Sequence, residues 1–140
     1  MCRLLIPRMI QNKFGRIIAL TSTTGKEPDQ GMALSNTARA GMIAYAKTLS
    51  REIAEHNITV NSILTGGVMS ERTVDLVKQE AAKSGQGYDE FLKQAVHSIP
   101  TKHLPSPEEF APILAFLASP LSMSINGTSM PVDCGSMRSI

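Results

Sequence analysis

The chain has 140 residues, of which 42% are hydrophobic, and this size and apolar content predict one domain with a single core. Its 14 basic and 12 acidic residues leave a formal net charge of +2 without a long basic cluster, which argues against a nucleic-acid or membrane-surface partner. Two isolated cysteines and three scattered histidines predict neither a disulfide framework nor a metal site, and they favour a reducing, cytoplasmic setting.

The first thirty residues predict a helix, a strand and a loop. Residues 2–12 place apolar side chains on one helical face, but the segment is too short for a membrane span or a signal-peptide core. Residues 16–20 form a continuous apolar run, which is typical of a strand covered on both faces. Residues 21–31 are rich in turn-forming side chains and predict a loop at the carboxyl end of that strand.

A long helix is expected over residues 33–55. Its apolar residues fall on one face: Leu34, Ala38, Met42, Ala46, Leu49 and Ile53. Its small residues would let another backbone approach closely, either within the molecule or from a second copy: Ala38, Ala40, Gly41 and Ala44.

Residues 58–64 predict a second β-rich strand, so that strand, helix and strand form a parallel βαβ unit. Thr65 and the two glycines after it break this strand. Ser70 is expected to cap a further helix, which Gly85 ends. Another helix follows from about residue 89 to 98.

The last forty residues predict one helix and one strand. Ser106 and Glu109 form a capping box around Pro107, and the helix that starts there should extend to Ala118. Residues 125–132 predict a short strand, and Pro131 within it favours the edge of a sheet.

Four stretches carry the functional information. They are GRIIALTSTTG at residues 15–25, ALSNTARAGMIAYAKTLSREIA at 33–54, ITVNSILTGGVMS at 58–70, and IPTKHLPSPEEFAPILAFLASPLSMSINGTSMPVDCG at 99–135. Together they resemble the short-chain dehydrogenase/reductase family, and most closely its 3-oxoacyl thioester reductases. In that family a strand ends in a catalytic Ser, a helix presents Tyr and Lys four residues apart, and the next strand leads into a Pro-Gly turn.

The resemblance implies an α/β fold of Rossmann type with a doubly wound parallel sheet. It also implies that residues 1–140 correspond to the C-terminal half of that fold, because the glycine-rich turn that binds the cofactor pyrophosphate is absent from the sequence. The cofactor would be NAD or NADP, and the substrate a small molecule with a carbonyl or hydroxyl group.

The resemblance also nominates catalytic residues. Ser22 stands at the family's Ser, whereas Ser35 replaces its Tyr and Arg39 replaces its Lys. A serine hydroxyl is a poor general acid near neutral pH, and a guanidinium stays charged, so Arg39 would hold ribose or an anion rather than donate a proton. Each position also has a structural interpretation: Ser22 as an ordinary loop residue, Ser35 as a helix cap, and Arg39 as the partner of a nearby acid.

Cofactor contacts are expected from the turn that follows the second strand. Thr65 replaces the family's Pro, Gly66 keeps its Gly, Val68 would offer main-chain contacts, and Ser70 keeps a hydroxyl. A plain strand-to-helix turn explains the same residues without a ligand.

Two functions follow as alternatives. One is an NAD(P)(H)-dependent oxidoreductase that interconverts carbonyls and alcohols with a divergent site. The other is a non-catalytic cofactor-binding, ligand-binding or oligomerisation module. Because a half-sheet exposes an edge, we expect a homo-oligomer in either case.

Overall fold

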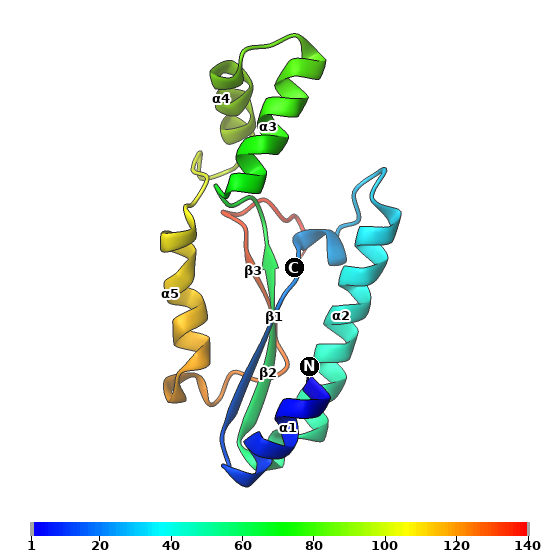
Figure 1. The fold of residues 1–140 in the computed structure, drawn as a ribbon, viewed down its shortest axis with the longest axis vertical. Helices are drawn as coiled ribbons and strands as arrows, with labels where there is room; N and C mark the ends of the chain where they lie inside the picture. Colours follow the sequence, from blue (N-terminus) through cyan, green and yellow to red (C-terminus); the bar gives the residue numbers. More distant parts are fainter. Residues whose placement is uncertain (1, 140) are drawn as a thin grey trace.

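The computed structural model describes residues 2–139, and within this range it shows an α/β chain with one parallel sheet (Figure 1). The strands are β1 (Gly15–Leu20), β2 (Ile58–Thr65) and β3 (Ser129–Val132). The helices are α1 (Cys2–Gln11), α2 (Ala33–Glu52), α3 (Glu71–Ser84), α4 (Tyr88–Ser98) and α5 (Pro107–Ala118). Short 3-10 turns are η1 (Thr23–Gly25), η2 (Ala54–His56) and η3 (Pro120–Ser122).

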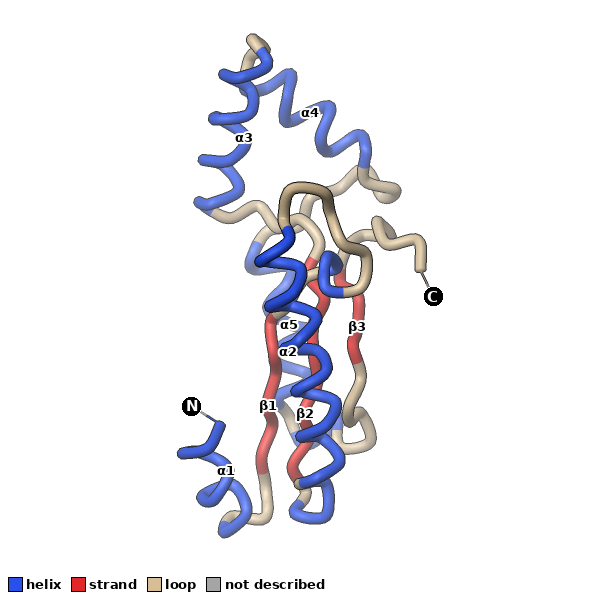
Figure 2. The backbone as a smooth tube through the Cα atoms, turned by 90° about the vertical axis from the view of Figure 1, so that its right-hand side faces the viewer, coloured by secondary structure: helices blue, strands red, loops and turns tan. Residues whose placement is uncertain are grey.

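The sheet has the order β1-β2-β3, and β2 pairs in parallel with both neighbours. Gly15 lies opposite Ile58, and Ser129 lies opposite Ser62. In Figure 2 the strands lie side by side behind α2, with the α3–α4 pair beyond one end. The predicted βαβ unit is therefore confirmed, and the α/β class with it.

Helices cover both faces of the sheet, with α1 and α2 on one face and α5 on the other (Figure 1). Successive strand residues point to opposite faces, so β2 contributes Val60 to the core under α2 and Ile63 to the core under α5. Leu117 of α5 is fully buried in the second core, and burial of such a side chain stabilises the fold by about 1.5–3 kcal/mol.

The predicted helix signals act as expected. Ser70 accepts a hydrogen bond from the Thr73 N–H and caps α3, and Gly85 ends that helix in the left-handed conformation, with φ of 70°. Ser106 and Glu109 form a complete capping box at the start of α5. The helices α3 and α4 pack against each other beyond the carboxyl ends of the strands (Figure 1).

The strand predicted over residues 125–132 is wrong in its first half, since β3 begins at Ser129. The backbone still bonds to β2 at this point, since the Gly127 N–H donates to the Val60 carbonyl and the Thr128 carbonyl accepts from the Ser62 N–H, both at 2.9 Å. Gly127, however, has a φ of 70°, which is not an extended conformation, and side-chain amides supply the remaining hydrogen bonds: Asn126 Oδ1 accepts from the Val60 N–H at 2.9 Å, and Asn61 Oδ1 accepts from the Thr128 N–H at 3.1 Å.

The apolar face predicted for α2 is buried only in its C-terminal half. Ala46, Leu49 and Ile53 lie in the core, whereas Leu34 is 90% exposed and Met42 is 46% exposed. The helix also stops at Glu52 and continues as η2, so its predicted end at residue 55 was three residues too late. The exposed face at the start of α2 has no covering element in the described part of the chain.

Candidate functional site

The candidate site lies where β1 and β2 end, because the loops that carry the predicted residues leave the sheet there. Thr21 joins the two strands: its N–H and its hydroxyl both donate to the Ile63 carbonyl, at 2.8 and 3.0 Å. The Thr65 hydroxyl donates in return to the Thr21 carbonyl at 2.9 Å. Thr21 is only 3% exposed, so this bridge gives both loops a fixed starting point.

Ser22 follows directly and caps η1. Its Oγ accepts hydrogen bonds from the Thr24 N–H and from the Thr24 hydroxyl, both at 3.2 Å. A serine oxygen has two lone pairs and one proton, so accepting twice leaves the proton of Ser22 as its only free hydrogen-bonding capacity. Ser22 is thus a loop-start residue that can still donate to a ligand.

Ser35 and Arg39 lie one helical turn apart on α2 and line the same shallow hollow of about 260 Å³. We call this the Arg39 hollow; its lining residues are Leu20, Thr21, Ser35, Ala38, Arg39 and Met42. Ser22 is not among them. The structure therefore unites two of the three predicted catalytic residues and places the third beside the hollow, one residue after Thr21.

The structure contradicts the alternative roles of both helical residues. Met32 is the N-cap of α2 and Ser35 is the third residue inside the helix, so Ser35 is no cap. The first turn of α2 contains no acidic residue, and none of the ion pairs among residues 2–139 includes Arg39. Arg39 therefore lines the hollow without a carboxylate partner among the described residues.

Gly25 sets the distance between η1 and α2. A Cβ atom at this position would lie 2.6 Å from Ile43 Cδ1 and 3.2 Å from the carbonyl carbon of Arg39. Such contacts are too close for any other side chain, so glycine permits the close packing of the Ser22 turn on the turn of α2 that bears Arg39.

The turn after β2 holds the predicted cofactor contacts. The hydroxyl of Thr65 already donates to the Thr21 carbonyl. Gly66 packs against Asp133, and a Cβ atom at position 66 would lie 2.7 Å from the Asp133 Cα. The Val68 carbonyl accepts from the Ser70 N–H at 2.8 Å and from the Thr73 hydroxyl at 2.6 Å. Because the Val68 carbonyl already accepts two hydrogen bonds, the main-chain group of Val68 that a ligand could use is its N–H.

Sequence reasoning missed Glu27, which holds the end of the chain against the site loop. Its carboxylate accepts from the backbone N–H groups of Arg138, at 2.9 Å, and of Ser139. These hydrogen bonds, first of all the one from Ser139, lower the pKa of Glu27 below its ordinary value of 4.5. No local signal predicts a contact between residues more than a hundred positions apart.

Asn36 was also missed. Its side chain is buried, and its Nδ2 donates to the Asp29 carbonyl at 2.8 Å, which ties the loop after η1 to α2. Asp133 plays a similar part in the C-terminal segment, where its carboxylate accepts from the N–H groups of Gly135 and Met137 at 3.1 and 2.6 Å. The signal in the sequence for side chains that bond to a loop backbone in this way is an Asn or Asp close to a polar loop.

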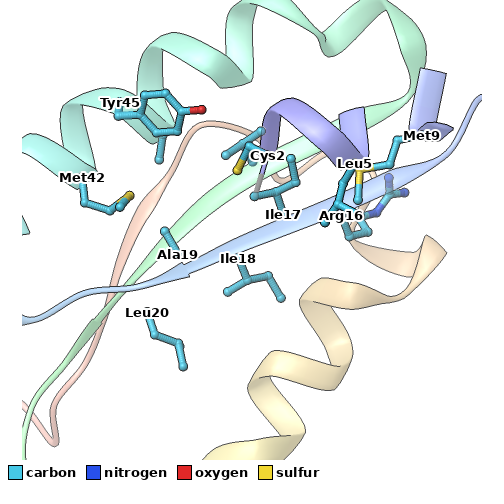
Figure 3. Close-up of a pocket in the computed structure, with 12 residues that line it drawn as sticks. Cys2, Leu5, Met9, Arg16, Ile17, Ile18, Ala19, Leu20, Met42 and Tyr45 are labelled. Atoms are coloured by element: carbon cyan, nitrogen blue, oxygen red, sulfur yellow. The ribbon is translucent and has the colours of Figure 1, made fainter. Parts of the chain in front are cut away.

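Tyr45 does not replace the missing acid. It lies beside Cys2 in a separate groove (Figure 3) and is not part of the Arg39 hollow. Desolvation, and next the nearby Cys2, raise the pKa of Tyr45 above its usual 10.0, which makes it a weaker acid. Lys47 points elsewhere, since its Nζ donates to the Gly127 carbonyl at 2.9 Å.

Comparison with known proteins is consistent with this geometry. The profile of a family described as enoyl-(acyl carrier protein) reductase matches residues 1–137. The NADPH-dependent reductase BacG of Bacillus subtilis (strain 168) is 36% identical over 132 residues, which cover 94% of this chain and 51% of BacG. The 3-oxoacyl-[acyl-carrier-protein] reductase FabG of Rickettsia conorii is 34% identical over 130 residues, which cover 93% of this chain and 49% of FabG.

Solved structures give the same result. YwfH, described as an NADPH dependent reductase involved in bacilysin biosynthesis, superposes with a TM-score of 0.92 at 34% identity. L-sorbose reductase from Gluconobacter frateurii, solved with NADPH and L-sorbose, also gives a TM-score of 0.92, at 27% identity. Each match covers 99% of this chain and 53% of the other.

The fold is thus a Rossmann-like α/β fold with a parallel sheet. The chain belongs to the short-chain dehydrogenase/reductase family. It spans about half the length of the curated relatives that it matches. Among the described residues, no helix is long and apolar enough to cross a membrane, and no group of three or more His, Cys, Asp or Glu could hold a metal ion.

Proposed function

We propose that this chain is the C-terminal part of a reductase that interconverts carbonyl and hydroxyl groups of 3-oxoacyl type with NADPH or NADH, through a divergent active site. The observation that supports the proposal is the Arg39 hollow: Ser35 and Arg39, which forms no ion pair among the described residues, line it near the carboxyl end of β1. Ligands bind at that end in sheets of this class. The names of the relatives, NADPH-dependent and 3-oxoacyl reductases, support the reaction type.

The residues present suit the nicotinamide end of such a cofactor. Arg39, which has no ion-pair partner within residues 2–139, would hold ribose hydroxyls or an anionic group, while the N–H of Val68 and the turn from Thr65 to Ser70 would contact the carboxamide side. The cofactor, when bound, supplies the hydride. A glycine-rich pyrophosphate turn is not part of this sequence, so that half of the cofactor needs another polypeptide segment.

The chain's own residues favour electrostatic catalysis over proton donation. Ser22 has one free proton with which to hydrogen-bond a carbonyl oxygen, because both acceptor positions of its Oγ are used by Thr24. Arg39 stabilises negative charge that develops on that oxygen, as fixed cations do in other active sites. Ser35 is too weak an acid to protonate it, so the proton comes from water.

A second candidate is a binding or oligomerisation module that has lost catalysis. It is favoured by the exposed face of α2, where Leu34, Met42 and Tyr45 are each at least 46% exposed. Such a face would make this chain a homo-oligomer whether or not it catalyses a reaction. The unpaired cysteines, Cys2 and Cys134, suit a cytoplasmic setting in either case.

The test restores the family's residues. The double variant Ser35→Tyr with Arg39→Lys should raise NADPH-dependent reduction of a 3-oxoacyl thioester at least tenfold, since it supplies an acid of suitable pKa. The matched control, Ser35→Phe with Arg39→Lys, differs by one hydroxyl and should show no gain. If neither the native protein nor the Tyr variant binds NADPH in a fluorescence titration, the reductase proposal fails and the second candidate stands.

A further inference from the structure

Residues 133–139, which we call the C-terminal segment, join the two loops of the candidate site. Where the segment begins, the Gly66 N–H donates to the Val132 carbonyl at 3.0 Å, and Gly66 packs against Asp133. Where it ends, Oε1 of Glu27 accepts from two backbone N–H groups of the segment. The segment therefore extends from the turn after β2, which holds the predicted cofactor contacts, to the loop after β1, which holds the predicted catalytic serine.

Asp133 keeps the C-terminal segment compact. This residue is only 9% exposed, and its two carboxylate oxygens accept from the N–H groups of Gly135 and Met137. Its carbonyl accepts from the N–H and the hydroxyl of Ser136, at 3.2 and 2.8 Å. Hydrogen bonds to a carboxylate are stronger than those between neutral groups. The segment is thus a folded turn built on a buried side chain, and it offers Glu27 a fixed pair of N–H groups.

Glu27 also closes the turn that Ser22 caps. Its N–H donates to the Thr23 carbonyl at 2.9 Å. Within the same turn the Thr24 N–H donates to Ser22 Oγ at 3.2 Å, and the Gly25 N–H donates to the Ser22 carbonyl at 3.0 Å. The backbone of Glu27 therefore helps to form this turn, while its carboxylate fixes the turn to the C-terminal segment.

The turn depends on contacts from outside, because η1 has only three residues and the hydrogen bonds of so short a 3-10 turn are weak. One such contact comes from α2, on which Gly25 packs closely. The other comes from the C-terminal segment through Glu27. Loss of the second contact leaves the turn, and with it the hydroxyl of Ser22, held from one side.

We propose that Glu27 is a positioning residue: by binding the C-terminal segment, its carboxylate holds the Ser22 hydroxyl where it bonds the carbonyl oxygen of the substrate. This inference rests on the proposed function. Glu27 acts through Ser22 and not on the reacting atoms. Because the hydrogen bond from Ser22 strengthens as negative charge develops on the carbonyl oxygen, displacement of Ser22 lowers kcat more than it changes KM.

A double-mutant cycle with Ser22 tests this role. Glu27→Ala should lower kcat for a 3-oxoacyl thioester about fivefold with little change in KM, because a small displacement of a catalytic group has effects of at least this size. Glu27→Gln keeps an acceptor oxygen and should recover part of the loss. In a Ser22→Ala background, Glu27→Ala should have no further effect, since the hydroxyl that it positions is gone.

Variants of Arg138 test the same contact from its other end. Arg138→Pro removes the N–H that Glu27 accepts at 2.9 Å, whereas Arg138→Ala keeps this N–H. The proline variant should lower kcat about twofold or more, because one of two bonds to the carboxylate is lost, and the alanine variant should keep the native rate. Asp29→Ala removes a carboxylate from the same loop and, as the control for charge, should also keep it.

Hydrogen exchange reports on the turn without any reaction. The amide hydrogens of Thr24 and Gly25, which bond to Ser22, should exchange about fivefold faster in Glu27→Ala than in the native chain, and at the native rate in Asp29→Ala. If the native protein reduces no carbonyl, the proposed function fails, and faster exchange in Glu27→Ala would still support Glu27 as the residue that holds Ser22.

Three results would overturn the inference. The first is equal exchange of the Thr24 and Gly25 amides in Glu27→Ala and in the native chain. The second is an equal loss of kcat from Glu27→Ala in the native and the Ser22→Ala backgrounds, which a general loss of stability would produce. The third is the same kcat for Arg138→Pro and Arg138→Ala, because the N–H of the C-terminal segment would then have no part in the reaction.

Discussion

Single residues at the end of β1 define what the site can do. Ser22 keeps a free proton because Thr24 uses its lone pairs, and no ion pair among residues 2–139 offsets the charge of Arg39. The place of Ser22 at the end of β1 could be anticipated, because it follows an apolar run in the sequence. The position of Ser35 inside the helix could not, since serine is favoured at caps and only the backbone geometry shows that the cap is Met32.

A serine substitution tests the hydrogen-bond argument. Ser22→Ala should lower kcat/KM of the native protein for a 3-oxoacyl thioester by about 10–100-fold, because a donor to the developing oxyanion is lost. Ser22→Thr keeps the hydroxyl and should recover most of the activity. Steady-state kinetics measure both. Equal rates for the Ala and Thr variants would exclude Ser22 from the reaction.

Glu27 predicts a dependence of the C-terminal segment on pH. The folded pKa of this carboxylate is lowered below 4.5, so its contacts stabilise the segment above that value and are lost as the pH falls through the folded pKa. The amide of Arg138 should thus lose protection from hydrogen exchange in acid, after correction for the intrinsic pH dependence of exchange.

A matched pair of variants isolates the charge of Glu27. Glu27→Gln keeps an acceptor and should leave Arg138 partly protected without a pH transition, whereas Glu27→Ala should remove the protection at every pH. Identical exchange of Arg138 in all three proteins would contradict the contact.

At the scale of elements, local signals predicted most boundaries well. The capping box at Ser106 and the stop at Gly85 act through neighbouring backbone groups, so a few residues of sequence suffice to find them. The errors have a non-local origin. The left-handed Gly127, with the amides of Asn61 and Asn126 bonding across to and from β2, keeps residues 125–128 out of β3. Whether the apolar residues at the start of α2 are buried depends on tertiary contacts, which the sequence pattern of the helix does not reveal.

Two glycines near α2 should respond in opposite ways to the same substitution. Gly25→Ala should lower the free energy of unfolding by about 1–3 kcal/mol, since its Cβ would collide with Ile43 and the backbone of Arg39. Gly41→Ala should raise it by about 0.5–1 kcal/mol, because a Cβ there meets nothing within 4 Å and alanine favours the helix.

Urea denaturation of the two glycine variants measures both changes. A Gly25→Ala variant as stable as the native chain would show that η1 does not pack on α2 as described. Loss of stability in Gly41→Ala would show that this face of α2 is tightly packed in solution.

At the scale of the whole molecule, β2 is the central strand of the described sheet, and β1 and β3 are its two edges. The sequence predicted a partial doubly wound sheet because its motifs resemble only part of the family pattern, and the superposition on about half of YwfH agrees with that. Which strands form the edges could not be predicted from local patterns, because that depends on the order of the strands. In the described sheet they are β1 and β3.

The edge strand β1 and the exposed apolar face of α2 also predict self-association of the chain. Sedimentation of the isolated chain over a range of concentrations should show mass above 15.1 kDa, because β1 and the exposed face of α2 leave apolar surface in contact with water. A strict monomer at every concentration would contradict the expected homo-oligomer.

The central claim, reduction of a carbonyl by hydride at the Arg39 hollow, is tested most directly by isotope transfer. NADPH and NADH deuterated at the transferable position are each incubated with the native protein and a 3-oxoacyl thioester, and the product is examined by mass spectrometry. The account predicts one deuterium on the alcohol carbon with at least one cofactor, and Arg39→Ala should form much less of this labelled alcohol in the same time. A product without label from both cofactors, or an equal amount of labelled alcohol from Arg39→Ala, would contradict it.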